Sequence, residues 1–299
     1  MTSAAQAALH SWSIPIGVSL VLCLAAMIYL RGWFRLRAAF PNLIRVWRLA
    51  AFGAGIVSVW IAIGSPLAAL DEMSLSVHMV QHLLLMAFAP PLLLFGAPAL
   101  PLLRGLPQTI TRHVASPFLR WRLVKSLGHF FTHPAVSWLA AVLALIGWHI
   151  PAVFALASRW GWLHELEHLS FFGTGLLFWW PVVRPWPAAA RWPRWSIPLY
   201  LFCATLPCDA LSAFLVFCDR VVYSAYLAGP RAFSISPLQD QQCAAALMWV
   251  SVTIVFLVPA VVVTLEILSP RGMPSTQETW AGFQGILGQP SDPSKFEVI

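Results

Sequence analysis

The chain has 299 residues, of which 59% are hydrophobic and 10% are charged, and its formal net charge at pH 7 is +7. A soluble surface needs roughly a quarter of its residues charged, so this composition excludes an ordinary soluble enzyme and indicates an integral membrane protein. We therefore interpret the basic excess as a signal of orientation in, and contact with, the lipid bilayer, and we expect no nucleic-acid partner.

Seven stretches are apolar enough to cross a bilayer, which takes about 20 helical residues. In chain order they are residues 13–30, 47–65, 78–97, 134–152, 163–183, 197–217 and 244–268. They predict an all-α, polytopic membrane protein with seven transmembrane helices in a single domain over residues 1–268. Pro90 and Pro91 fall inside the third span, where we expect a kink. The segment 269–299 is rich in Pro, Gly, Ser and Gln, which predicts a disordered cytoplasmic tail.

The links between these spans differ strongly in charge. Fifteen of the eighteen Lys and Arg residues lie in the links 31–48, 98–133 and 184–196 and in the C-terminal tail. Because basic links stay in the cytoplasm, this asymmetry predicts an N-terminus outside and a C-terminus inside. Within the second of these links, the segment 118–131 alternates apolar residues with Arg and Lys, which predicts an amphipathic helix on the inner leaflet.

Five histidines share the outer side in this topology. His78 and His82 enter the third span, His149 closes the fourth, and His164 and His168 open the fifth. Each pair stands four residues apart, so on a helix its two imidazoles share one face. A single membrane histidine is often explained by a hydrogen bond to a neighbouring helix. Two such pairs together with a third helix at one depth predict a metal site with these five histidines as ligands.

Other side chains could support such a site. Met79 and Met248 offer thioethers, although packing is the ordinary role of a membrane methionine. Asp209 lies inside the sixth span, where a charge costs about 2.5–3.5 kcal/mol on insertion scales and needs a partner or a function. Asp240 precedes the seventh span on the outer side. Carboxylates that would attract a cation or orient the imidazoles are Asp71, Glu72, Glu165 and Glu167.

Three chemistries fit these residues. The run 164–168 has the H-E-x-x-H pattern of zinc proteases, in which the glutamate is the general base, but that hypothesis leaves the other three histidines without a role. Facing histidine pairs, such as His82 with His168, could instead ligate haem. Imidazole together with thioether suits copper better than zinc, and an outer site could exchange copper with donors outside the membrane.

A series of short motifs resembles the CtaG-type cytochrome c oxidase assembly proteins, which are multi-span proteins of bacterial membranes. In chain order the motifs are His78-Met79 with Gln81-His82, Pro90-Pro91, Gly96-Ala97-Pro98, Trp148-His149 with Pro151, His164 with Glu167-His168, Phe178-Trp179-Trp180-Pro181, Asp209, Tyr223 with Tyr226, and Asp240-Gln241 with Met248-Trp249. Each motif is short, but their order and spacing make the set specific from the third span to the seventh.

The resemblance implies a non-enzymatic assembly factor of the bacterial cytoplasmic membrane that helps to mature a haem–copper oxidase, plausibly by delivering copper. Its expected partners are oxidase subunits or other assembly factors, and the five histidines carry over as candidate ligands. Glu167, Asp209, Asp240, Met79 and Met248 carry over as supporting residues. A haem-binding redox protein and an intramembrane zinc protease remain the alternatives.

The five cysteines include no C-x-x-C pair, so a thiol copper-shuttle motif is absent from the sequence. Cys218 and Cys243 bracket the link between the last two spans on the side predicted to be outside. A disulfide between them and two separate thiols both fit that position.

Overall fold

The computed structural model describes residues 14–39, 45–185, 192–227 and 230–269, together with Thr2, Ser3, Gln6 and His10. Every regular element in these residues is a helix, and none of them forms a strand, which confirms the predicted all-α class. The predicted tail falls, from residue 270 on, outside the described residues, so the division into one domain and a disordered tail stays a prediction.

Nine of the helical segments form the body of the bundle. They are α2 (Ile16–Ala39), α3 (Val46–Gly64), α5 (Leu75–Leu83), the π-helical turn η2 (Leu84–Phe88), α6 (Ala89–Phe95), α11 (Pro134–His149), α13 (Gly161–Val183), α14 (Ser196–Phe217) and α15 (Pro237–Leu268). Shorter segments connect them: α4 (Leu67–Leu70), η1 (Asp71–Met73), α7 (Ala99–Gly105), α8 (Gln108–Ile110), η3 (Thr111–Ala115), α9 (Ser116–Arg120), α10 (Arg122–Phe131), α12 (Pro151–Ala157) and η4 (Ser224–Tyr226).

Five helices of the described chain are long and apolar enough to cross a membrane, and the number rises to six if α10 and α11, bent by 67° at their junction, count as one span. The five are Ile16–Ala38, Val46–Met73, Leu75–Phe95, Ser196–Phe217 and Pro237–Leu268. Helix α13, the predicted fifth span, is 23 residues long but has two glutamates and two histidines in its first turns, and it is not among them. The seven-span count therefore stays a prediction.

The third span is continuous but irregular. Its first helix, α5, passes through the π-helical turn η2 into α6, whose first residues include Pro90 and Pro91. The main-chain oxygen of Met86 has prolines at both i+4 and i+5, so neither an α-helical nor a π-helical N–H can reach it. The indole of Trp179 on α13 donates to this oxygen at 3.2 Å. The two prolines thus free a carbonyl that joins the third span to α13.

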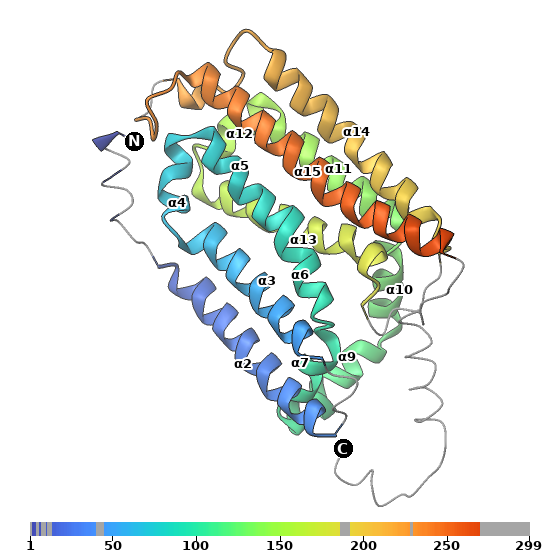
Figure 1. The fold of residues 1–299 in the computed structure, drawn as a ribbon. Helices are drawn as coiled ribbons and strands as arrows, with labels where there is room; N and C mark the ends of the chain where they lie inside the picture. The colour runs from blue at the N-terminus through green and yellow to red at the C-terminus, as the bar shows by residue number, and fades with distance from the viewer. Residues whose placement is uncertain are drawn as a thin grey trace, which may run out of the picture.

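The connected α5, η2 and α6 lie in the middle of the bundle, between α3 and α13, while α15 packs against α5 and lies side by side with α14 (Figure 1). One apolar cluster joins α5, α11, α13, α14 and α15. A second joins α2 and α3 to η2 and α6. In the second cluster Tyr29 stacks on Phe52, with ring centroids 3.8 Å apart, and donates to the main-chain oxygen of Gly96 at 2.8 Å. The central helix is therefore held from both sides.

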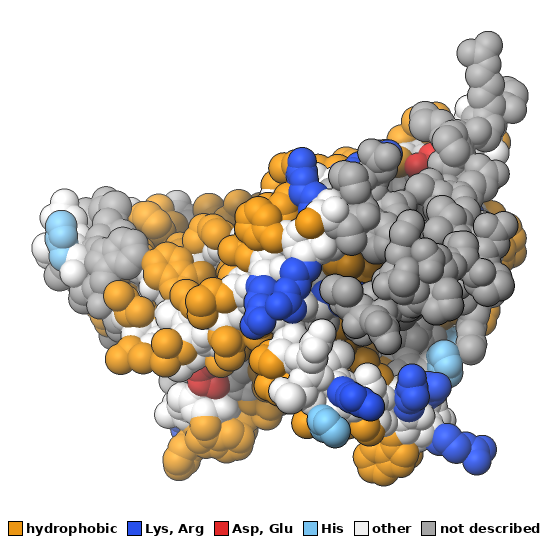
Figure 2. Space-filling view, turned by 90° about the horizontal axis from the view of Figure 1, so that it is seen from below, with side chains coloured by type: hydrophobic (Ala, Val, Ile, Leu, Met, Phe, Trp, Pro, Cys, Tyr) orange, Lys and Arg blue, Asp and Glu red, His pale blue; other side chains and the backbone are white. Residues whose placement is uncertain are grey.

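The two ends of the bundle differ. Helices α4 and α12 and the starts of α5 and α15 gather at one end, and α7, α9 and α10 gather at the other (Figure 1). Figure 2 views the second end and shows Lys and Arg side chains among many exposed hydrophobic ones. The amphipathic segment predicted at 118–131 is helical but broken at Trp121, between α9 and α10, and Leu123, Leu127 and Phe130 of α10 are exposed. Contact of α10 with a membrane surface stays a prediction.

Candidate metal centre

Four of the five predicted histidines meet where α5 faces α13. Along each helix the members of a pair lie one turn apart, with ring centroids at 4.1 Å for His78 and His82 and at 4.3 Å for His164 and His168. Across the interface the ring centroids of His78 and His164 are 5.5 Å apart, and those of His82 and His168 are 5.8 Å apart. The i, i+4 spacing thus produces two facing pairs of imidazoles, at the end of the bundle where α5 begins.

Two carboxylates complete this cluster. Glu167 is 1% exposed, and its Oε1 lies 3.8 Å from Nε2 of His78 and 3.6 Å from Nε2 of His82. Asp71 is 3% exposed, and its Oδ2 lies 3.6 Å from Nε2 of His164. Ligands bound 2.0–2.1 Å from an ion in trigonal or tetrahedral geometry stand about 3.3–3.6 Å apart. These three histidine–carboxylate distances therefore lie within a few tenths of an ångström of the spacing between two ligands of one ion.

The donors fall into two overlapping triads. Asp71, His78 and His164 form one, and His78, His82 and Glu167 form the other; within each triad the ligand atoms lie within 4.8 Å of one another. We call the five residues of these triads, together with His168, the His–carboxylate cluster. His164 is its most accessible member, with a side chain that is 26% exposed. An ion would therefore meet His164 and Asp71 before it reached the buried triad.

Many polar atoms of this cluster are buried without a hydrogen-bond partner among the described residues. They are Nε2 of His78, both ring nitrogens of His82 and of His168, Oδ1 of Asp71 and Oε2 of Glu167. Leaving a buried polar group unpaired costs about 1–3 kcal/mol, so folded proteins pair nearly all of them with protein, water or an ion. Unpaired imidazole and carboxylate atoms at ligand spacing fit a metal ion, which would satisfy several of them at once.

His149 lies apart from the paired histidines. Its Nδ1 is 2.7 Å from the main-chain oxygen of Leu145, one turn earlier on α11, and its Nε2 is buried without a partner among the described residues. It contacts a cavity whose lining also includes His82, Met79 and Met248. The structure therefore places three of the predicted residues, His149, Met79 and Met248, around a second space that adjoins the cluster through His82.

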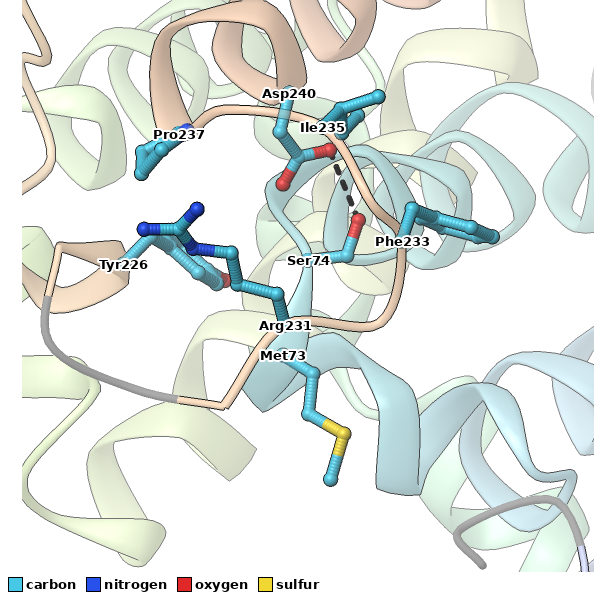
Figure 3. Close-up of a pocket in the computed structure, with 8 residues that line it drawn as sticks. All are labelled: Met73, Ser74, Tyr226, Arg231, Phe233, Ile235, Pro237 and Asp240. Atoms are coloured by element: carbon cyan, nitrogen blue, oxygen red, sulfur yellow. Dashed lines mark hydrogen bonds between the residues drawn. The ribbon is translucent and has the colours of Figure 1, made fainter. Parts of the chain in front are cut away.

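Asp240 does not offer a free carboxylate to an ion. Its Oδ1 accepts hydrogen bonds from the hydroxyls of Ser74 at 2.9 Å and Ser76 at 2.6 Å, and its Oδ2 accepts from the main-chain N–H of Leu75 at 2.7 Å. Figure 3 shows the Ser74 contact beside Tyr226 and Arg231. The first N–H groups of a helix have no partner within it, and a negative charge there is favourable. Asp240 of α15 thus caps α5 and positions the helix that bears His78 and His82.

Asp209 lies on α14, next to Cys208, which lines the cavity. Its side chain is half-buried, and its Oδ1 has no hydrogen-bond partner in the described part of the chain. None of the contacts of the described residues joins it to the histidines. Its expected support of the site stays a prediction.

Motif residues without ligand chemistry hold the segments around the cluster. Gln81 donates to the main-chain oxygen of Ala62 on α3 at 2.9 Å. Tyr223 donates to the main-chain oxygen of His149 at 3.3 Å, and Tyr226 to that of Asp71 at 2.9 Å. Burial and the nearby Asp71 and Asp240 carboxylates raise the pKa of Tyr226 well above its ordinary value, so this hydroxyl stays a donor. These residues position ligand-bearing segments.

The H-E-x-x-H run does not have the arrangement that a zinc protease needs. In that pattern the glutamate after the first histidine is the general base beside the metal. Here this residue, Glu165, is exposed, and the buried carboxylate is that of Glu167, two positions later. The run therefore works as two histidines and a displaced carboxylate on one helical face. The cysteine pair left open by the sequence is also resolved, because Cys218 and Cys243 are both free thiols.

Comparison with protein families decides the relationship. The family model described as cytochrome c oxidase caa3 assembly factor (Caa3_CtaG) matches residues 27–269, which include every member of the His–carboxylate cluster. The chain belongs to this family. Membership confirms the resemblance seen in the ordered motifs from His78 to Trp249.

Curated relatives extend the comparison to longer proteins. A protein of Mycobacterium leprae is 29% identical over 167 residues, which cover 55% of this chain and 25% of the relative. Proteins of Mycobacterium bovis and Mycobacterium tuberculosis are each 31% identical over 170 residues, which cover 56% of this chain and 26% of the relative. The chain thus matches about a quarter of the length of these relatives, all three of which are called uncharacterized. No solved structure matches the chain.

Proposed function

We propose that the chain is an assembly factor for a haem–copper cytochrome c oxidase and that it binds copper in the His–carboxylate cluster. The observation that supports this most is the set of buried, unpaired imidazole and carboxylate atoms at ligand spacing between α5 and α13. Family membership supports the oxidase part of the proposal, because the family is described as an oxidase assembly factor. Its partners are then oxidase subunits or other assembly factors, and the protein is not an enzyme.

We further propose that the protein has seven spans in the bacterial cytoplasmic membrane, with α11 and α13 as the fourth and fifth. Buried polar residues make α13 less apolar than a typical span, yet they lie on the side that faces the bundle, while Trp162, Leu166 and Leu169 are exposed on its other side, as lipid contact requires. Basic side chains gather at the end of the bundle opposite the cluster (Figure 2). Under the positive-inside rule that end faces the cytoplasm and the cluster faces outward, where external copper can reach it.

The donors favour copper over the alternatives. Imidazole is a ligand that suits copper, and thioethers, which select Cu(I), are offered by Met79 and Met248 in the lining of the adjoining cavity. Haem ligated by two histidines needs room for a macrocycle between the imidazoles. The rings of His78 and His164 are stacked on each other instead, with centroids 5.5 Å apart and planes inclined by 15°, which argues against haem. Two histidines and one carboxylate are also a known donor set for non-haem iron, so the test below measures iron and zinc as well as copper.

The test removes His78, which both triads share, together with His164, the second histidine of the first triad. His78→Ala combined with His164→Ala should lower the amount of copper bound to the purified protein at least tenfold. In a strain that has no other assembly factor to replace this protein, membranes that carry the double variant should contain little active oxidase. His113→Ala, at the other end of the bundle and exposed, is the matched control and should match the unaltered protein in both measurements. Normal copper content and oxidase activity in the double variant would overturn the proposal, as would iron or zinc in place of copper.

A further inference from the structure

A second space adjoins the His–carboxylate cluster and differs from it in chemistry. It is a cavity of about 20 Å³ beneath His82, enough for one water-sized occupant. Its donors are the imidazoles of His82 and His149, the thioethers of Met79, Met86 and Met248, and the thiol of Cys208. Its remaining lining is apolar, and no carboxylate is among the described residues that form it. We call it the sulfur cavity.

The tautomer of His149 prepares one ligand atom for this space. The carbonyl of Leu145, 2.7 Å from Nδ1, can only accept a hydrogen bond, so Nδ1 bears the proton of the neutral ring. Nε2 therefore presents a lone pair, and it is buried without a partner in the described part of the chain while the residue is 6% exposed. A hydrogen bond from one ring nitrogen to a carbonyl commonly orients the other nitrogen for a metal.

The charge of the lining restricts the ion. The thioethers, the thiol and the imidazoles of the lining are all neutral groups. The lining therefore offers no negative charge to compensate the second positive charge of a divalent ion. The cost of burying an ion rises steeply with its charge. Thioether and imidazole donors favour Cu(I), whereas zinc, iron and calcium favour sites with more nitrogen, thiolate or carboxylate. A soft monovalent ion therefore fits this space better than any divalent one.

His82 connects the two spaces. Its Nε2 lies 3.6 Å from Glu167 within the cluster, and the same ring lines the sulfur cavity. Neither of its ring nitrogens has a hydrogen-bond partner among the described residues. One imidazole can thus bind an ion on either side of it, by one nitrogen or the other. The cavity is also the deeper of the two spaces, because it extends along α5 past Met79 to Met86 in the π-helical turn.

We propose that the sulfur cavity is a distinct Cu(I) site, in which His149 and the thioethers of Met86 and Met248 hold the ion that the cluster receives. The inference rests on the proposed function, since it takes the neighbouring cluster as the place where copper arrives. The ion is monovalent in both spaces, so its passage involves ligand exchange at His82 with no oxidation or reduction.

The test measures the atoms around bound Cu(I). Full-length protein in lipid nanodiscs, loaded with one equivalent of Cu(I) under anaerobic reducing conditions, should show sulfur scatterers beside nitrogen in X-ray absorption at the copper edge. Met86→Leu combined with Met248→Leu should remove the sulfur signal and weaken Cu(I) binding at least tenfold, measured by competition with a Cu(I) chelator. Leucine nearly conserves the volume of methionine, so the fold should tolerate both changes. Met27→Leu, on the exposed face of α2, is the matched control and should change neither quantity.

The outcomes separate this inference from the proposed function. Copper bound with nitrogen and oxygen scatterers alone in the unaltered protein would overturn the sulfur site and leave the cluster intact, whereas absence of bound copper would overturn both. A sulfur signal that survives in the double methionine variant would also overturn the assignment. Cobalt(II) binding at the cluster reports on folding and should be unchanged in that variant. Conversely, His78→Ala with Glu167→Gln should abolish cobalt binding and keep the sulfur signal.

Discussion

The interface between the third span and α13 has two halves that are built in opposite ways. In the outer half, where α5 faces the start of α13, imidazoles and carboxylates approach one another with many polar atoms unpaired. In the inner half, where η2 and α6 face the middle of α13, the contact is close, and the carbonyl of Met86 that the prolines free accepts a hydrogen bond from Trp179. The same two helices thus meet once at the candidate metal site and once in a tightly packed contact.

The inner half can hold the groups of the outer half in place. Each unpaired buried polar group destabilises a fold by about 1–3 kcal/mol. Such groups stay at close distances only where the surrounding packing and hydrogen bonds fix their positions. The inner half supplies that constraint through packing at Gly175 and the hydrogen bond at Trp179. Asp240 supplies it at the other end by capping α5. If the inner half holds the outer half in this way, a substitution in the inner half should weaken metal binding although it changes no candidate ligand.

The largest effect is expected at Gly175, the point of closest approach in the inner half. A Cβ there would lie 2.9 Å from the main-chain oxygen of Met86 and 2.9 Å from Pro90, so α13 would have to move. We expect Gly175→Ala to lower the free energy of unfolding by about 1–3 kcal/mol, as overpacking does, and to weaken metal binding because His164, Glu167 and His168 move with the helix. Thermal unfolding in detergent and elemental analysis measure the two effects.

Gly173, two residues earlier on the same helix, offers a matched control. A Cβ at this position would meet nothing within 4 Å. Gly173→Ala should therefore leave metal binding unchanged and stability equal or slightly higher, since alanine is the better helix former. If both glycine variants behave alike, helix composition explains the result and the close approach of α13 to η2 does not set the geometry of the site.

A smaller effect is expected from the two glutamates of the H-E-x-x-H run, which sharpen the comparison within the outer half. Glu167→Gln removes the buried charge beside His78 and His82 and should weaken metal binding about 10–100-fold, or about 1.4–2.7 kcal/mol. Glu165→Gln alters an exposed carboxylate on the same helix and should leave affinity unchanged. Equilibrium dialysis of both variants against the metal decides between them. Loss of affinity in Glu165→Gln, with none in Glu167→Gln, would contradict the assignment of Glu167 to the site.

Much of the outer half was predictable from local sequence. The pairs His78–His82 and His164–His168 need only the helical period to share a face, and the loop charges place both at one end of the bundle. Local pattern does not show which helices face each other. His149 therefore looked equivalent to the paired histidines, although it lies at a different space. Asp240 was expected to support the site, but the sequence does not show that its oxygens would do so by capping α5.

The inner half was the less predictable one. The prolines at 90 and 91 indicate a kink, but nothing local shows that the freed carbonyl of Met86 pairs with an indole 93 residues later. Asp71 was recognisable as one of several carboxylates that would attract a cation. Its side chain reaches His164 because Asp71 lies in the turn η1, whose main chain accepts a hydrogen bond from the hydroxyl of Tyr226. In each case the missing information is a contact between segments far apart in the sequence.

The smallest effect concerns the hydrogen bond that joins the two helices. Trp179→Phe removes the indole donor and leaves the oxygen of Met86 unpaired, which should cost about 1 kcal/mol of stability, together with the loss of some buried ring surface. A second substitution can separate the contribution of the buried ring surface to stability from that of the hydrogen bond. In Pro90→Ala, residue 90 gains an N–H at i+4 from Met86, so the helix itself can pair that oxygen.

A double-mutant cycle with Trp179→Phe and Pro90→Ala therefore isolates the hydrogen bond. Because the oxygen has a replacement donor in the Pro90→Ala background, Trp179→Phe should cost about 0.5–1 kcal/mol less there than in the unaltered chain. Thermal unfolding of the four proteins in one detergent gives the coupling. Strictly additive costs would mean that Trp179 acts only by packing, and the two prolines would then have no part in holding the third span to α13.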